Sequence, residues 1–495
     1  MNMKRIIAAA ALLAVLSSLF CLAGCVKPAE VGAKLSDNIA RLWFPGERES
    51  RFVLNSQPIE GSVTGQAFLD PASNGRTAIA WVDVTPYFVS EKGVDKLTDA
   101  TSAAIISFDG SCAVYQAGEQ LMLFSAETRS ASVIAEGVAS VQQISVSPAS
   151  KAVAFTAQFS DSGAERRSMI YKDGSLTPIL EGKDAIVMAV SDDASLCYYY
   201  DFGEATVYAE QNGEKTVVTT KPSLKTNFNF TRDLSEVAFC DSEDVNHLFR
   251  LSDKQTFDLG EGFQYTLKTD IYSVSATNVI TYINDVDSFE NGLWLKRDTI
   301  DGVRVYAVGL INGKGELNWL AEHVGSYAST NDGKRVLSLG GGKLVSTDMK
   351  GKSRELAADV ASFAITDDGS FTYYISSAGT LFGIEGTGKP VKLASNASSV
   401  KVSGGVCFCL TDVTGEGDAA CGTLKTFRGL EASADIAKNV SSFDRRNGHV
   451  IVYVLPEDGS GKPIVETAED GAVLLNAWFT CDGSDMKLLG EKVEK

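Results

Sequence analysis

Short apolar runs alternate with polar, glycine-containing turns from about residue 50 to the end of the chain. Runs such as 121–124 and 450–453 have the length and the β-branched or aromatic content of half-buried strands. Helical 3.6-residue periodicity is essentially absent from this part of the chain. The pattern therefore predicts an all-β protein with many short strands joined by tight turns.

One turn pattern recurs along the predicted strands. It has the form Ser/Thr-x-Asp-Gly, follows one apolar strand and leads directly into a second. Copies begin at Ser107, Ser147, Ser191, Thr231, Thr330 and Thr366, with weaker copies near Asn74, Ser275, Ser403 and Asp444. Similar segments also end the units, at 134–140, 320–326, 356–362 and 436–442. The period is about 35–45 residues, with one longer unit between Ser275 and Thr330, which indicates a propeller or a solenoid.

A unit of this size contains about four strands, and a single four-stranded sheet cannot bury both of its faces. Radial stacking covers each face with the neighbouring sheet and leaves only short edges. We therefore predict a β-propeller over residues 51–495, with about eight four-stranded antiparallel blades and a range of seven to ten. Ten turn copies leave three arrangements open: weak copies that share a blade, an unusually wide ring, or two smaller rings.

Residues 147–155, Ser-Pro-Ala-Ser-Lys-Ala-Val-Ala-Phe, and their Asp-Gly relatives resemble the blade signature of TolB-like, WD-repeat-like propellers. That signature is serine-proline-aspartate-glycine followed by a polar residue and an apolar strand. The resemblance covers roughly residues 75–460 and implies the propeller architecture. Only one copy carries the proline, and that copy lacks the aspartate and glycine, so no subfamily follows.

The N-terminus has the pattern of an export signal. Lys4 and Arg5 precede an almost unbroken apolar run over 6–20. Leu22, Ala23, Gly24 and Cys25 follow and resemble the bacterial lipobox, which implies cleavage after residue 24 and diacylation of Cys25. Two acyl chains give stable anchoring. The alternative is an uncleaved transmembrane anchor over residues 6–24.

These features predict three segments: a lipoprotein signal peptide at 1–24, a lipidated tether at 25–50 with a short helix over 33–43, and the propeller. The expected location is the extracytoplasmic face of a bacterial cell membrane, with the lipid on Cys25 as the contact to the membrane. No second apolar run of spanning length follows.

The chain carries 63 acidic and 45 basic residues, for a net charge of −18, which excludes a polyanion such as nucleic acid as a partner. Seven cysteines remain after Cys21 and Cys25, an odd number that does not fit a paired disulfide framework. Cys421 could still form a disulfide with Cys407 or Cys409 across a hairpin. The three histidines lie far apart in sequence.

Few motifs indicate chemistry. Residues 383–389 match the start of a phosphate-binding loop, but Pro390 replaces the required Ser or Thr, so we interpret them as a hairpin turn. Acidic turns occur at 241–244, at Asp412 with Glu416 and Asp418, and at 285–291. Asp285, Asp287, Glu290 and Asn291 are weak candidates for a calcium site. None matches the twelve-residue calcium loop, and solvated turns are the preferred interpretation.

The leading functional hypothesis is a monomeric, membrane-anchored lipoprotein whose propeller binds a protein, peptide or glycan without catalysis. No cofactor, metal or catalytic residue is assigned. The alternative is an extracellular propeller-fold hydrolase or lyase that uses carboxylates in the channel. A third hypothesis, a substrate-capture protein serving a transporter, is disfavoured because typical capture proteins are α/β.

Overall fold

The computed structural model describes residues 39–495 except 56, 102, 162, 164, 180–183, 224–226, 262, 266–270, 274–280, 285–287, 290–292, 301–302, 312–313, 331–334, 349 and 447–448. Over this part the chain is almost entirely β-structure, and the one helical element described is a single 3-10 turn, η2 (Gly417–Ala419). The all-β prediction is confirmed.

Nine groups of four antiparallel strands make up most of the described chain. The first four groups are β4 (Phe68–Pro71), β5 (Thr77–Val82), β6 (Thr85–Ser90), β7 (Gly93–Lys96); β8 (Ala104–Ile106), β9 (Cys112–Ala117), β10 (Gln120–Ser125), β11 (Ser130–Glu136); β12 (Val138–Val146), β13 (Ala152–Phe159), β14 (Arg166–Lys172), β15 (Ser175–Pro178); and β16 (Ala185–Val190), β17 (Leu196–Asp201), β18 (Thr206–Gln211), β19 (Glu214–Thr219).

The next five groups are β20 (Phe228–Thr231), β21 (Glu236–Cys240), β22 (Val245–Arg250), β23 (Gln255–Glu261); β24 (Phe263–Tyr265), β27 (Leu293–Ile300), β28 (Val303–Ile311), β29 (Leu317–Val324); β30 (Ser326–Ser329), β31 (Arg335–Gly340), β32 (Lys343–Asp348), β33 (Ser353–Ala357); β34 (Val360–Ile365), β35 (Phe371–Ser376), β36 (Leu381–Glu385), β37 (Val391–Ala394); and β38 (Ala397–Ser403), β39 (Val406–Thr414), β40 (Cys421–Arg428), β41 (Glu431–Arg446).

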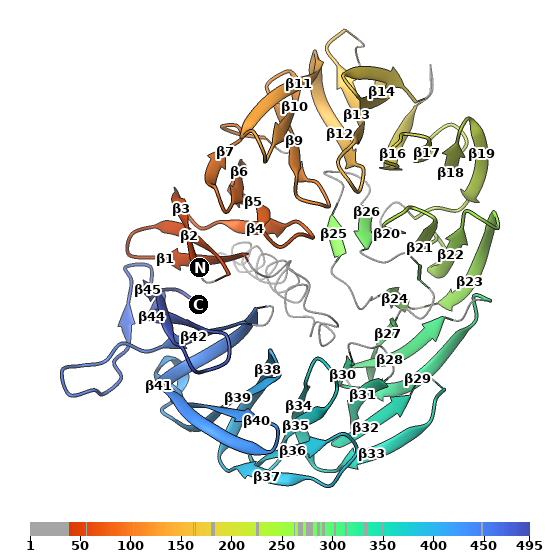
Figure 1. Ribbon diagram of the computed structural model, residues 1–495. Coiled ribbons are helices and arrows are strands. Elements are labelled where there is room, and N and C mark those ends of the chain that lie inside the picture. Colours follow the sequence, from red (N-terminus) through yellow and green to blue (C-terminus); the bar gives the residue numbers. More distant parts are fainter. Residues whose placement is uncertain are drawn as a thin grey trace, which may run out of the picture.

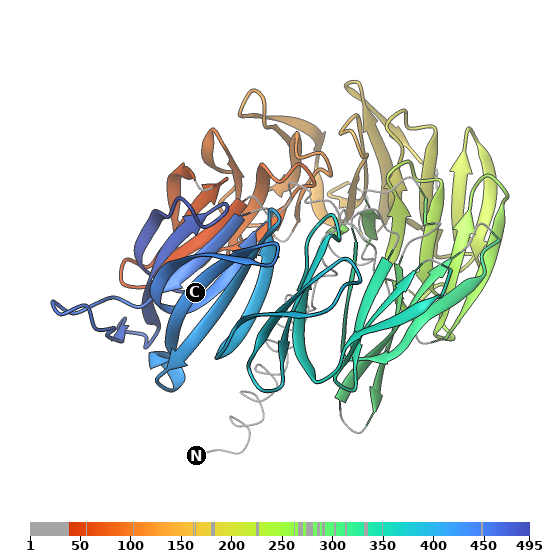
Figure 2. The ribbon, with the colours of Figure 1, turned by 60° about the horizontal axis from the view of Figure 1, so that its bottom comes forward.

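These groups are the blades of one ring and radiate about a shared centre (Figures 1 and 2). The first strand of each blade lies nearest the centre, and the last strand, such as β23, β33 or β37, lies at the periphery (Figure 1). The β-propeller prediction is confirmed. The nine complete blades lie within the predicted range of seven to ten, one above the favoured eight, and further strands come from the two ends of the described chain. Of the three arrangements left open, the structure shows the single wide ring.

The recurring turn closes the hairpin between the first and second strands of a blade. In residues 191–196, Oδ1 of Asp193 accepts hydrogen bonds from Ser191 Oγ at 2.6 Å, Ser195 N at 2.9 Å and Ser195 Oγ at 2.8 Å. Ser191 Oγ in turn accepts from Leu196 N at 3.0 Å. Residues 107–112 and 231–236 form the same network. The side chains thus satisfy turn amides that the strand ladder leaves unpaired.

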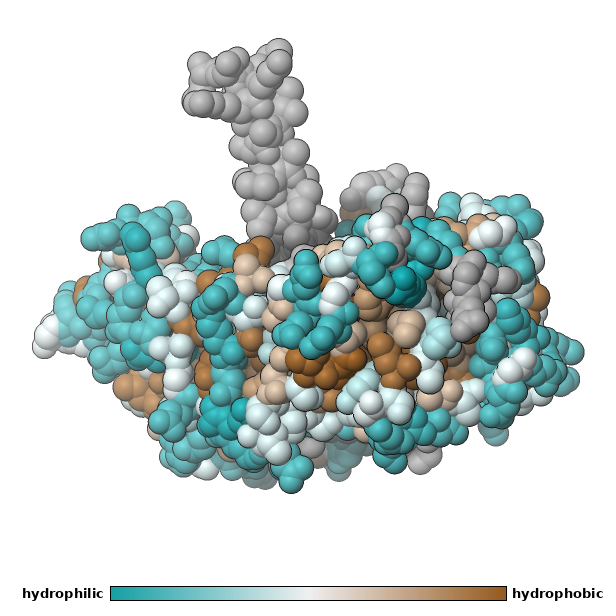
Figure 3. All heavy atoms as spheres, turned by 90° about the horizontal axis from the view of Figure 1, so that it is seen from above, coloured by the Kyte–Doolittle hydropathy of each residue, from teal (hydrophilic) through white to brown (hydrophobic). Residues whose placement is uncertain are grey.

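The blades pack face to face through a series of apolar core clusters. The largest cluster takes Val114, Phe155, Tyr198 and Phe230 from four successive blades, each fully buried. Full burial of each such side chain is worth roughly 1.5–3 kcal/mol. Each blade therefore depends on its neighbours for stability. Hydrophilic side chains cover most of the outer face seen in Figure 3, around a few apolar patches.

Both ends of the described chain take part in closing the ring. β1 (Ile39–Phe44), β2 (Glu49–Leu54) and β3 (Gln57–Thr64) form a three-stranded sheet. The end of β41 pairs with β42 (His449–Val454), followed by β43 (Glu466–Thr467), β44 (Val473–Thr480) and β45 (Lys487–Val493). Glu494 N donates to Trp43 O at 2.7 Å, and side chains of β1, β42, β44 and β45 share one core cluster.

This closure corrects the tether prediction. Residues 39–50 belong to the first sheet of the ring, and the described part of the segment expected to be helical, 33–43, is strand β1. The apolar residues of this segment lie on two opposite faces, as in a strand: Leu42 and Phe44 pack against β42, β44 and β45, whereas Ile39 packs with Phe52 toward β5. Tertiary burial between two sheets decides the local conformation.

The longer unit predicted near Ser275 has a structural explanation. Between β24 and β27 the chain adds β25 (Ile271–Ser273) and β26 (Thr281–Asn284), and β26 pairs in parallel with β20 of the preceding blade. Both strands lie on the central side of β20 (Figure 1). Phe289 follows these strands in the sequence and is fully buried, in a core that it shares with Leu248 and Trp294.

Candidate functional site

Several residues singled out from the sequence lie outside the described residues. They are Leu22, Ala23, Gly24 and Cys25 of the lipobox, and Asp285, Asp287, Glu290 and Asn291 of the weak calcium candidate. Within the part of the chain that is described, no three His, Cys, Asp or Glu residues group as a metal site would require. No described helix has the length and apolar character needed to cross a membrane.

The acidic turn at 241–244 forms hydrogen bonds within its own hairpin. The Asp241 carboxylate accepts hydrogen bonds from Glu243 N and Val245 N at 2.9 Å each, and it lies 3.0 Å from His247 Nε2. Although burial opposes ionisation, these hydrogen bonds hold the pKa of Asp241 below its usual value. The turn joins β21 to β22, the second and third strands of a blade, and its carboxylate stabilises the fold.

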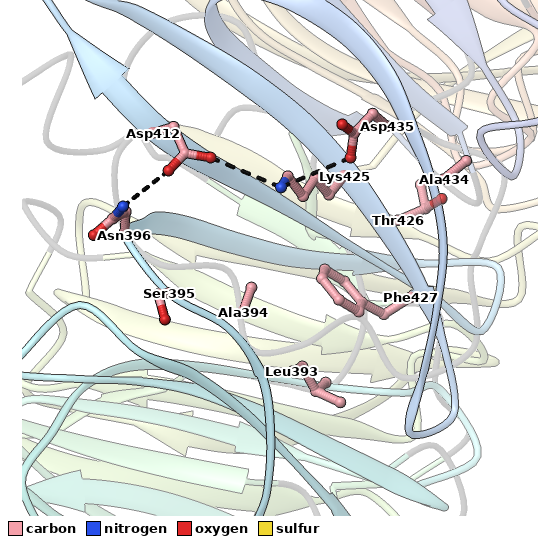
Figure 4. A pocket seen from close by; sticks show the side chains of 10 residues that line it. All are labelled: Leu393, Ala394, Ser395, Asn396, Asp412, Lys425, Thr426, Phe427, Ala434 and Asp435. Atoms are coloured by element: carbon pink, nitrogen blue, oxygen red, sulfur yellow. Dashed lines mark hydrogen bonds and ion pairs between the residues drawn. The ribbon is translucent and has the colours of Figure 1, made fainter.

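Asp412, expected from the sequence to lie in an acidic turn, belongs to strand β39 and borders an open groove of about 400 Å³ at the seam between two blades (Figure 4). One wall is the end of β37 and the turn after it. The other wall comes from β39, β40 and β41 of the next blade. The lining residues are Leu393, Ala394, Ser395, Asn396, Asp412, Lys425, Thr426, Phe427, Ala434 and Asp435. We refer to this hollow as the seam groove.

Asp412 is held in a fixed orientation at the end of the seam groove. Asn396 Nδ2 donates to Asp412 Oδ1 at 2.9 Å, and Thr411 Oγ1 donates to Oδ2 at 3.0 Å. These two hydrogen bonds, together with the nearby Lys425 ammonium, hold the pKa of Asp412 below its usual value. Asp412 and Asn396 both adopt a positive φ of 54°, a conformation that Asp and Asn tolerate better than most residues. The carboxylate therefore stays ionised at neutral pH and acts as an acceptor.

Lys425 lies between two carboxylates (Figure 4). Its Nζ is 3.7 Å from Asp412 Oδ2 and 3.8 Å from Asp435 Oδ1, which is ion-pair range but longer than a hydrogen bond. The strand register explains the arrangement, because Lys425 of β40 pairs directly with Asp435 of β41 and their side chains share a face. The groove thus presents acceptor, donor and acceptor in a row above the apolar side chains Leu393 and Ala394.

A second hollow of about 570 Å³ lies between the blades β4–β7 and β8–β11. The polar groups that line it mainly form hydrogen bonds with other groups of the protein. Lys92 Nζ donates to Glu127 O at 2.9 Å, and Asn74 Nδ2 donates to Asp109 O at 2.9 Å. Ser150 Oγ of the following blade donates to Asp109 Oδ1. These bonds tie the recurring turns of neighbouring blades together, so we assign this hollow a structural role.

All seven described cysteines are free, which corrects the suggested disulfide of Cys421 with Cys407 or Cys409. In the sheet register Cys421 lies opposite Thr414, whereas Cys407 and Cys409 lie opposite Phe427 and Lys425. This register places Cys421 opposite the end of β39, several residues away from the partners of Cys407 and Cys409, so the thiols do not meet.

Cys481 is the exposed member of this group, and its Sγ lies 3.3 Å from Nδ1 of His449. Burial raises the pKa of the Cys481 thiol, helped by the neighbouring Asp482, and burial lowers the pKa of His449. Both groups therefore tend toward neutrality. This gives a thiol that donates to an imidazole, and not a thiolate nucleophile.

Sequence reasoning identified one member of the seam groove, Asp412, and assigned it to a solvated or calcium-binding turn. It missed Asn396, Lys425 and Asp435. Asn396 lies in the turn after β37, and Lys425 and Asp435 lie on β40 and β41 of the next blade, so no local spacing signals their meeting. Only the strand register of β40 and β41 could have paired Lys425 with Asp435 in advance.

No protein-family model and no curated protein sequence matches this chain. Solved structures do match. A crystal structure described as the eukaryotic initiation factor is 9% identical, covers 92% of this chain and 97% of its own, and has a TM-score of 0.39. TolB from Acinetobacter baumannii is 14% identical over 56% of this chain and 77% of its own, with a TM-score of 0.21. The tricorn protease is 10% identical over 90% and 57%, with a TM-score of 0.29.

These similarities are distant, with identities far below the level at which function carries over. The β-propeller fold stands on the arrangement of this chain's own sheets, and ligand and activity have to be argued from its own residues.

Proposed function

We propose that this chain is a bacterial extracytoplasmic lipoprotein, anchored through lipid on Cys25, whose propeller is a non-catalytic binding module for a protein, peptide or glycan. The observation that carries the binding role is the seam groove. It is open, its polar groups alternate between acceptor and donor, and its carboxylates and ammonium come from rigid strands. Rigid polar groups of this kind fix the orientation of a ligand.

The protonation state of the groove supports binding over acid catalysis. A general acid needs a carboxyl group whose pKa is raised toward neutrality. The pKa of Asp412 is instead lowered by Asn396 and Thr411, so it has no proton to give at neutral pH. Lys425 then contributes a positive charge between two acceptors, which suits recognition of a polar partner.

The anchoring part rests on the lipobox-like sequence Leu22-Ala23-Gly24-Cys25 after an apolar run. Mass spectrometry of the protein purified from bacterial membranes tests it. The proposal expects an N-terminal peptide beginning at Cys25 with a mass increase of fatty acyl chains. A Cys25→Ser variant should remain unlipidated. An N-terminal peptide that retains residues 1–24 without acyl groups would refute the anchor.

The binding part is tested by affinity capture from a native bacterial envelope extract. Wild type is compared with a variant that removes the groove charges, Asp412→Asn with Lys425→Met. The proposal expects captured material that is lost with the variant. Capture that is equal for both proteins, or absent for both, would refute a binding role for the groove.

A further inference from the structure

We propose that the seam groove receives an extended polypeptide segment of a partner protein, whose Lys or Arg side chain is bound by the carboxylates of Asp412 and Asp435 beside Lys425. This inference rests on the proposed binding function and names the chemistry of the partner. It follows from three properties of the site: an unpaired strand edge, a hollow of side-chain size, and an excess of negative charge.

The strand edge belongs to β37. Among the described strands β37 pairs only with β36, so its other edge presents unpaired backbone N–H and C=O groups. Val391 on this strand is 41% exposed, and Leu393 and Ala394 line the groove itself. An exposed edge with accessible apolar side chains is a template for an added strand. An extended segment running along β37 reaches the groove at its end.

The hollow has the size and lining for one long side chain. Its volume of about 400 Å³ exceeds that of a single Lys or Arg side chain and leaves room for adjoining backbone. Leu393, Ala394 and Ala434 can contact an aliphatic stem, while Asp412 and Asp435 accept from a cationic head. Lys and Arg side chains bury their stems along apolar surface in this way.

The net charge of the groove favours a cationic side chain of the partner. Two carboxylates face one ammonium, so the groove keeps one net negative charge inside a chain of net charge −18. Lys425 lies beyond hydrogen-bond distance of either carboxylate, which leaves both with acceptor capacity. A glycan is disfavoured because the aromatic residue in the groove, Phe427, is 1% exposed and offers no ring face for stacking.

The test is selection of displayed random nine-residue peptides on the full-length chain purified in detergent, at about 0.15 M salt. Three proteins are compared: wild type, the groove variant Asp412→Asn with Asp435→Asn, and a control variant, Glu119→Gln with Asp173→Asn. The control removes the same charge from exposed turns between other strands. It corrects for general attraction of basic peptides to an acidic surface.

We expect wild type and control to select peptides with one Lys or Arg at a constant position among β-branched or apolar residues. On the groove variant the affinity for a selected peptide should fall at least about fivefold, which is about 1 kcal/mol. Replacing the basic residue of that peptide with Gln should cause a similar loss on wild type.

Equal enrichment of basic peptides on all three proteins, or no Lys or Arg preference on wild type, would overturn the peptide assignment. Binding of a glycan array that depends on Asp412 would also overturn it while leaving the binding function intact. If the envelope capture described above also fails, both the binding function and the peptide assignment are refuted. If the capture succeeds, only the peptide assignment is refuted.

Discussion

A buried ion pair anchors the long excursion of the chain between β24 and β27, and its removal gives the sharpest test of the fold. Arg250 Nε donates to Glu236 Oε1 at 2.9 Å, and both side chains are at most 9% exposed. The other oxygen, Oε2, accepts from Ser288 Oγ at 3.1 Å and from the backbone N–H of Phe289. Glu236 therefore connects strands β21 and β22 to the returning segment.

The magnitude follows from what each substitution leaves behind. Glu236→Leu leaves the guanidinium of Arg250 buried without its carboxylate partner, which costs about 3–5 kcal/mol. Arg250→Met leaves a buried carboxylate and costs a similar amount. In the double variant neither charge remains, and the main residual cost is the lost hydrogen bond from the Phe289 amide to Glu236, about 1–3 kcal/mol. We expect a coupling energy of about 3 kcal/mol or more, well above the ~0.5 kcal/mol typical of independent sites.

The assay is urea-induced unfolding of wild type, both single variants and the double variant. Intrinsic tryptophan fluorescence is a suitable probe because Trp294 is buried in the same cluster as Phe289. The expected order of unfolding midpoints is wild type highest, the double variant intermediate, and the single variants lowest. Additive single effects would show that Glu236 and Arg250 do not act as a pair, and the reasoning would fail.

Three further results are expected. Hydrogen bonds within the turn lower the pKa of Asp193 to about 2, below its value of about 3.9 in an unfolded chain. The stabilisation by this carboxylate is therefore present above about pH 4 and lost toward pH 2. The difference in urea midpoint between wild type and Asp193→Asn should shrink on acidification, and a constant difference would contradict this. Alkylation of the native chain should modify Cys481 before the other described cysteines, because Cys481 is exposed. The reaction at pH 7 should be slower than that of a free cysteine peptide, because burial raises the pKa of the Cys481 thiol. Peptide mapping that finds Cys407 labelled first would contradict this expectation. Gly490→Ala would place a Cβ 2.7 Å from Cζ of Phe44, where the two ends of the described chain meet. This substitution should lower the stability of the protein by about 1–3 kcal/mol, measured by thermal unfolding. An unchanged Tm would argue against tight packing between β1 and β45.

The blade repeat could be predicted because its signals are local. The turn at 191–196 closes on itself through hydrogen bonds among residues at most five positions apart, so every copy carries the same short pattern. The strands on either side need only alternation and apolar content. The prediction of a helix that included residues 39–43 was wrong for the opposite reason. The strand conformation of this segment comes from burial against β42 and β44, more than 400 residues away along the chain.

The seam groove shows the same division. Asp412 was visible as an acidic turn residue, but its meaning depends on Asn396, Lys425 and Asp435, which other strands bring to it. The sequence by itself determined the secondary-structure class, the repeated unit and the need for units to cover one another, since these follow from periodicity and local hydrogen bonding. Tertiary structure alone decided the number of blades, the closure by both chain ends and the composition of the groove, because these depend on which distant surfaces meet and in which register.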